Sequence, residues 1–174
     1  MVRSYKFRLY PNKTCRKKLD ELLEAHRHVY NEGLEFCKTS YEQGLPFPGY
    51  IGVWNHLKAT RVHYPLMNCT SMQQTFRKLH KAYVAFFDRL KAWKKEPAKY
   101  PKPGPPRFKS FDRFKSFSFK PSDGASVITD KASRRNYLRL QNIGRVRIKW
   151  HREVPSDAVL KHILVRKSCN AWDV

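Results

Sequence analysis

Five prolines within ten residues divide this chain into two parts that must fold differently. Residues 97–106 read PAKYPKPGPP and also contain a glycine. Proline has no backbone N–H and a fixed φ angle, so this segment can form neither a regular helix nor a central strand. It predicts a stiff, extended connector. Apolar residues mostly recur at steps of three and four before it and at steps of two after it.

Before the connector, the apolar spacing is that of amphipathic helices. The predicted helices span residues 13–42, 51–63 and 70–95. We expect Asn12 or Thr14 to cap the first helix and Thr70 or Ser71 to cap the third, because these side chains accept hydrogen bonds from the free N–H groups of a first turn.

The other segments alternate apolar and polar residues, which predicts half-buried strands. The predicted strands span residues 2–10, 107–120, 137–150, 159–165 and 171–174. Phe117, Phe119, Val146 and Ile148 are expected to face a core, and the cations between such residues to line the opposite side. The pattern therefore predicts an α+β protein with a β-meander that carries one cationic face.

The charge of the chain is high and uneven. The net charge is +22 and the pI is about 10.2. Residues 21–54 hold two basic and five acidic residues, whereas residues 101–152 hold fourteen basic and three acidic ones. Nucleic acid is the usual polyanion that offsets such an excess, and a membrane surface is the alternative. Without an apolar stretch of about 20 residues or a secretory signal, we expect a cytoplasmic, nucleoid-associated protein.

Two sets of side chains are candidates for contacts with nucleic acid. Cations interleaved with aromatic rings suit RNA, because bases stack on rings and on guanidinium planes. The candidate RNA-binding residues are Arg3, Lys6, Arg8, Arg107, Lys109, Arg113, Lys115, Arg145, Arg147 and Lys149. The polar side of the third helix is either a solvated surface or a surface laid against DNA. The candidate DNA-binding residues are Gln73, Gln74, Arg77, Lys78, Lys81 and, between two core phenylalanines, Ser118.

Residues for metal or nucleophilic chemistry are sparse. The four cysteines are Cys15, Cys37, Cys69 and Cys169. They form no C-x-x-C pair, so we expect reduced, mostly buried thiols rather than a zinc site or disulfides. His26 and His28 lack partners at ligand spacing, which favours a structural or surface role. No phosphate-binding glycine loop or hydrolase motif is present, and we expect no metal, no cofactor and no catalytic residue.

Five segments occur in an order that resembles a known family. They are Tyr5–Pro11, Val29–Asn31, Gln74–Phe87, Pro106–Ser110 and Gly144–His151. Together they resemble the N-terminal half of TnpB (OrfB) proteins, which are transposon-encoded, RNA-guided DNA endonucleases related to the type V CRISPR effectors. The resemblance extends over essentially the whole chain.

The resemblance implies a fold and a set of partners. It implies a small antiparallel β-barrel of the wedge type, built from residues 1–11 and 101–174 and interrupted by a helical recognition domain at 12–100. It also implies that the helical domain reads a DNA motif, with Gln73 and Gln74 at the start of the third helix; these glutamines could equally be ordinary helix surface. The family's RuvC-like nuclease domain follows the barrel, and we expect it to be missing here.

Three functions are compatible with these observations. The first is a module that binds guide-type RNA and double-stranded target DNA without cleaving on its own. The second is a sequence-specific, repressor-like DNA-binding protein that uses the first and third helices. The third is one subunit of a split RNA-guided nuclease, whose carboxylates come from a separate nuclease subunit.

Overall fold

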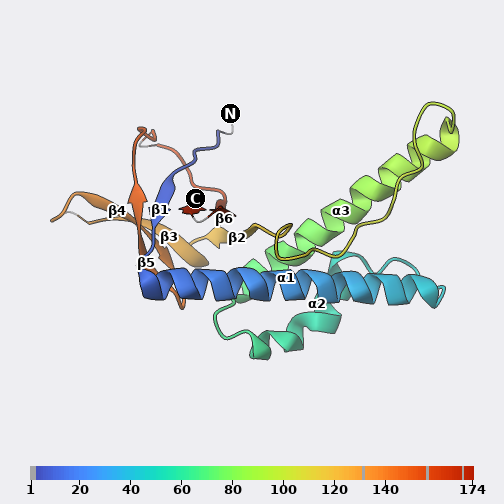
Figure 1. The fold of residues 1–174 in the computed structure, drawn as a ribbon, viewed down its shortest axis with the longest axis horizontal. Helices are drawn as coiled ribbons and strands as arrows, with labels where there is room; N and C mark the ends of the chain where they lie inside the picture. Colours follow the sequence, from blue (N-terminus) through green and yellow to red (C-terminus); the bar gives the residue numbers. More distant parts are fainter. Residues whose placement is uncertain (1–2, 131, 156, 170) are drawn as a thin grey trace.

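The computed structural model describes residues 3–130, 132–155, 157–169 and 171–174. Figure 1 shows the barrel at one end and the long helix α1 extending from it. Helix α3 rises at an angle from beside α1 and leads away from the barrel. In chain order the elements are β1 (Arg8–Tyr10), α1 (Lys13–Glu42), α2 (Gly49–Leu57), a 3-10 helix (Lys58–His63), α3 (Cys69–Lys95), β2 (Ser116–Pro121), β3 (Gly124–Asp130), β4 (Arg135–Leu140), β5 (Gly144–Lys149), β6 (Ile163–Ser168) and β7 (Ala171–Asp173).

The strands form a closed barrel in the order β1-β5-β4-β3-β2-β6-β7. The predicted α+β class and small barrel are confirmed. The expectation of a purely antiparallel barrel is wrong at one seam, where β2 and β3 pair in parallel through Lys120 with Gly124 and Pro121 with Ala125. The chain can make the tight loop between these paired residues because Ser122 and Gly124 have positive φ angles of 64° and 85°.

Alternation along the strands fills the barrel with apolar side chains. Phe117, Phe119, Val146 and Ile148 are all buried, as predicted. Leu9 of β1 is also buried, and β1 closes the barrel because it pairs with both β5 and β7.

The helices α1, α2 and α3 lie between β1 and β2 in the sequence. Asn12 caps α1 as predicted, since its side chain accepts a hydrogen bond from the Cys15 N–H at 2.7 Å. The predicted cap of α3 is wrong: Asn68 caps it and accepts from the N–H groups of Thr70 and Ser71. In the described part of the chain, no helix is both long and apolar enough to cross a membrane.

Four predicted segments differ from the structure. The predicted strand 159–165 is wrong over residues 159–162, because the observed strand β6 begins at Ile163 and continues to Ser168. Of the predicted strand 2–10, only Arg8–Tyr10 forms a paired strand, β1. Val2 lies outside the described residues. Residues 107–115 are not a strand, because this segment crosses α1 and makes hydrogen bonds there. Strand β3 was not predicted, since only Ala125 along it is fully buried and its apolar residues show no clear alternation. The predicted helix 51–63 is α2 followed by the 3-10 helix.

Candidate nucleic-acid interface

Strand β5 displays three cations on the outside of the barrel. Val146 and Ile148 point into the core, and Arg145, Arg147 and Lys149 alternate with them and are exposed. This orientation agrees with the sequence-based prediction, which followed from the period of two along a strand.

The neighbouring strands extend this surface into three rows of facing side chains. Arg8 of β1 is paired with Lys149. Arg147 lies between Tyr10 of β1 and Tyr137 of β4. Arg139 of β4 is paired with Arg145. We call this surface the cationic face, and it comprises Arg8, Tyr10, Tyr137, Arg139, Arg145, Arg147 and Lys149.

Two rows of the cationic face place like charges directly opposite one another. Such pairs destabilise a sheet, because facing side chains of an antiparallel pair lie only about 4.5–5.5 Å apart at Cβ. Within the described residues, Arg139, Arg145, Arg147 and Lys149 take part in no ion pair. Asp173 offsets the charge of Arg8, and Asp130 acts on Arg145 at longer range, so the repulsion is only partly offset within this part of the protein and a bound polyanion would relieve the rest.

Lys6 and Arg8, two of the candidate RNA-binding residues, meet a buried carboxylate. Arg8 Nε forms an ion pair with Asp173 Oδ1 at 2.9 Å, and Lys6 Nζ lies 3.2 Å from Asp173 Oδ2. Asp173 is only 3% exposed, so these two cations stabilise its charge. Arg3 precedes β1 and is exposed.

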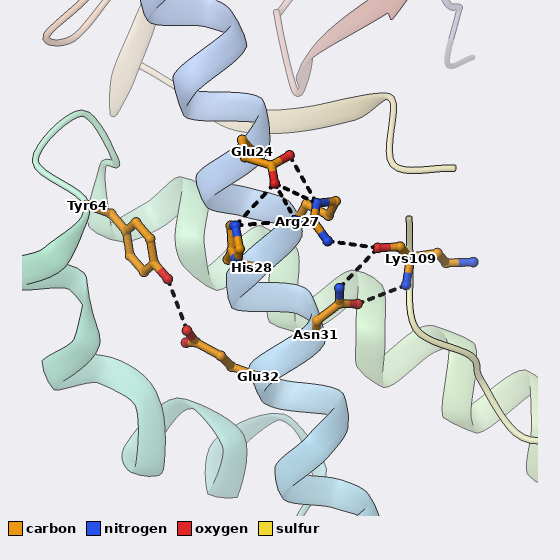
Figure 2. Close-up of polar contacts among 7 residues, drawn as sticks. All are labelled: Glu24, Arg27, His28, Asn31, Glu32, Tyr64 and Lys109. Atoms are coloured by element: carbon orange, nitrogen blue, oxygen red, sulfur yellow. Dashed lines mark hydrogen bonds and ion pairs between the residues drawn. The ribbon is translucent and has the colours of Figure 1, made fainter. Parts of the chain in front are cut away.

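A cluster on α1 fixes the chain that leads from the connector back to the barrel. Asn31 Nδ2 donates to the Lys109 carbonyl oxygen at 3.0 Å, and the Lys109 N–H donates to Asn31 Oδ1 at 2.9 Å. Arg27 Nη1 donates to the same carbonyl at 3.2 Å. We call Arg27, Asn31 and Lys109 the connector clamp; the Lys109 side chain points away from α1 (Figure 2). The clamp joins two of the five segments of the family resemblance.

The clamp and its surroundings are held in turn by two carboxylates of α1. Arg27 Nε donates to both oxygens of Glu24, at 2.9 and 3.0 Å, and this hydrogen bonding lowers the pKa of Glu24. Elsewhere on α1, Tyr64 donates its hydroxyl to Glu32 at 3.0 Å (Figure 2). Burial, and to a smaller extent this hydrogen bond, raises the pKa of Tyr64 to about 12. Helix α1 is thus a fixed support for the segments packed on it.

Between the clamp and β2, lysines cover the rings of residues 108–114. Lys38 lies over Phe108 at 4.1 Å from the ring centroid, and Lys115 lies over Phe111 at 5.2 Å. Lys115 is also 3.8 Å from Asp112. Of the candidate residues here, Arg107 and Arg113 are exposed, whereas Lys109 and Lys115 are half-buried.

The candidate DNA-binding residues lie on α3 and β2. Gln73 and Gln74 are half-buried in the first turns of α3 and Lys81 is exposed, while Arg77 lies over the Tyr50 ring at 4.8 Å. Lys78 donates to the Ser116 carbonyl at 3.3 Å, and burial, then the charge of Lys109, lowers its pKa.

Ser118 and Ser116 point to the same side of β2, because they are two residues apart on one strand. The structure thus brings Ser118 toward the side where α3 packs. Strand β2 is three strands from β5 in the barrel order, so this side is separate from the cationic face.

Three members of the cationic face were missed by the sequence analysis: Tyr10, Tyr137 and Arg139. The position of Arg139 could have been predicted from the turn at residues 141–143. A hairpin with this turn pairs Leu140 with Gly144, and this register places Arg139 opposite Arg145.

The residues with possible metal or redox chemistry have structural surroundings. His26 is fully buried, forms a 2.7 Å hydrogen bond with Thr75 and stacks on Phe117. Burial, then the charge of Lys78, lowers the pKa of His26 to about 3. All four cysteines are free, as expected. The prediction that they are mostly buried is wrong for Cys69 and Cys169, which are exposed at the first residue of α3 and in the β6–β7 turn.

Comparison with known families bears on the strand and helix that begin this chain. Residues 1–45 match the family model of the helix-turn-helix domain of the OrfB_IS605 type. The N-terminal region of this chain is of the OrfB/TnpB type. Within its described residues, this OrfB-type region contains β1 and the single helix α1. A search of curated proteins found none that matches the chain.

The OrfB-type region contributes to both surfaces described above. Strand β1 supplies Arg8 and Tyr10 to the edge of the cationic face. Helix α1 supplies Arg27 and Asn31 to the connector clamp.

Proposed function

We propose that this chain is a nucleic-acid-binding module of the OrfB/TnpB type, which holds a guide-type RNA on its cationic face. The observation that carries the proposal is the pair of like-charge rows, Arg8 with Lys149 and Arg139 with Arg145. A sheet gains nothing in stability from such pairs, whereas the phosphates of a strand lying across them would bind these cations favourably. Tyr10 and Tyr137 flank Arg147 and offer rings on which unpaired bases can stack.

Double-stranded DNA is the second partner that we propose, along the exposed side of α3. The match of residues 1–45 to a helix-turn-helix domain supports a role with DNA. Glutamine can pair with adenine through two hydrogen bonds, and each such contact contributes about 1–3 kcal/mol of discrimination. Gln73 and Gln74 are the candidates for base contacts, and Arg77 and Lys81 for contacts with the backbone.

The test of RNA binding is a pair of charge-matched triple variants. R145Q/R147Q/K149Q removes three cations of the cationic face, and K91Q/K94Q/K95Q removes three exposed lysines from the far end of α3. We expect the first variant to weaken binding of single-stranded RNA. The slope of log K against log salt concentration should also become less negative, by roughly 0.7 per lost phosphate contact. The second variant should bind nearly as well as the unaltered chain. Equal losses in both variants would refute a role for the cationic face.

A repressor-like DNA-binding protein is the alternative, and the helix-turn-helix match is the observation that favours it. A competition experiment between RNA and duplex DNA at the same salt concentration distinguishes the two functions. A repressor-like protein should release RNA when duplex DNA is added, whereas the RNA-binding module should retain it. Cleavage is not expected of the chain alone, and a nuclease would be supplied by a separate subunit. Mg²⁺-dependent nicking of a plasmid by the pure chain, lost on substituting one of its aspartates, would contradict this.

A further inference from the structure

A small cleft lies at the seam between β1 and β7, next to the first turn of α1. Its volume is about 270 Å³, and the residues that line it include Arg8, Tyr10, Arg16 and Trp172. Arg16 and Trp172 do not belong to the cationic face, whereas Arg8 and Tyr10 do. The cleft is therefore a recess that continues the cationic face toward α1.

The charges around the cleft favour an anion. The Arg8 guanidinium is held by Asp173 through Nε, which orients the group, and Lys6 contacts the same carboxylate. Two cations thus surround one buried carboxylate. Arg16 is exposed and, within the described residues, takes part in no ion pair. Guanidinium groups bind phosphate oxygens through two parallel hydrogen bonds, so this arrangement suits a phosphate group better than a single lysine would.

The size of the cleft limits the ligand. Pockets for drug-sized ligands have volumes of about 300–1,000 Å³, so a cleft of this volume has room for one nucleotide rather than a length of strand. Tyr10, 52% exposed, borders the cleft and can stack with a base. We propose that the cleft holds a single nucleotide of the bound RNA, with its phosphate between Arg8 and Arg16 and its base against Tyr10. This proposal rests on the proposed RNA-binding function.

The test is an NMR titration of the ¹⁵N-labelled full chain with uridine monophosphate, and in parallel with uridine. We expect the monophosphate to shift the signals of residues 8–10 and the Trp172 indole saturably, and uridine to leave them unchanged. Arg16→Gln should weaken binding of the monophosphate about tenfold, the effect of losing one charged hydrogen bond. The matched control is Lys17→Gln, which removes an exposed charge from the same turn and should change the affinity less than about twofold.

Several outcomes would overturn the proposal. They are shifts confined to other parts of the protein, equal shifts with uridine, and equal losses in R16Q and K17Q. Binding of a single-stranded RNA is measured on the same samples. If RNA binds and the cleft signals do not move, the cleft proposal is wrong and the proposed function stands; if no RNA binds, both are wrong. Where the cleft signals move, preference for RNA with a 5′-phosphate over RNA with a 5′-hydroxyl assigns the cleft to a strand end, and equal binding assigns it to an internal nucleotide. Either result supports the cleft.

Discussion

Replacing Asn31 by alanine should destabilise the protein by releasing the segment that leads into β2. The substitution removes two hydrogen bonds to the Lys109 backbone, of 3.0 and 2.9 Å. Each contributes about 1 kcal/mol, and the Lys109 N–H left without a partner costs about 1 kcal/mol more. Alanine returns about 0.5 kcal/mol through its higher helix propensity. We expect the free energy of unfolding to fall by about 2–2.5 kcal/mol in urea titrations followed by circular dichroism.

The control for this variant is Asn55→Ala, which changes an exposed asparagine of α2 in the same way. It carries the same gain in helix propensity without the lost hydrogen bonds. Trypsin adds a local measurement, because residues 94–115 are rich in lysine and arginine and should be cut faster in N31A. If N31A and N55A have the same stability and the same cleavage pattern, the clamp does not hold this segment and the reasoning is refuted.

Two further predictions concern stability. Burial lowers the pKa of His26 to about 3, so between pH 8 and 5 the unfolded chain binds a proton that the folded chain does not. The free energy of unfolding should therefore fall by about 2 kcal/mol as the pH drops from 8 to 5. His26→Gln should abolish this part of the pH dependence in urea titrations, and an unchanged dependence would contradict the argument. Gly124→Ala should cost at least 1–2 kcal/mol by the same assay, since the φ angle is +85° and a Cβ would lie 2.8 Å from Asn68 Nδ2. The control Gly104→Ala, where the nearest atom would be 4.0 Å away, should be close to neutral, and similar values for both glycines would refute the argument.

The sequence predicted the elements whose signal is local. The helix α1 was placed within a residue at each end, because its apolar residues recur regularly and Asn12 caps it. The outward orientation of Arg145, Arg147 and Lys149 followed from alternation along one strand. These features depend on neighbours in the chain, and a single sequence contains them.

What the sequence could not predict depends on pairing between distant segments. Residues 107–115 have the alternation of a strand, yet their backbone groups bond to Asn31 and Arg27, which lie far away in the chain. The facing pair of Arg8 and Lys149 likewise depends on which strand closes the barrel. Nothing in the sequence around Asp173 indicates a special role, and only the fold shows that it is buried against two cations.

The position of β1 in the barrel has a consequence for folding during synthesis. Leu9 pairs with Ile148 on one side and with Trp172 on the other, so both partners of the first strand are synthesised long after it. At about 5–20 residues per second, β1 waits roughly 8–30 s for its second partner. The contacts between α1 and α3, such as His26 with Thr75, span much less of the chain. The helices can therefore pack while Leu9 is still exposed, and the barrel closes after them, in the slow manner expected of pairings between distant segments.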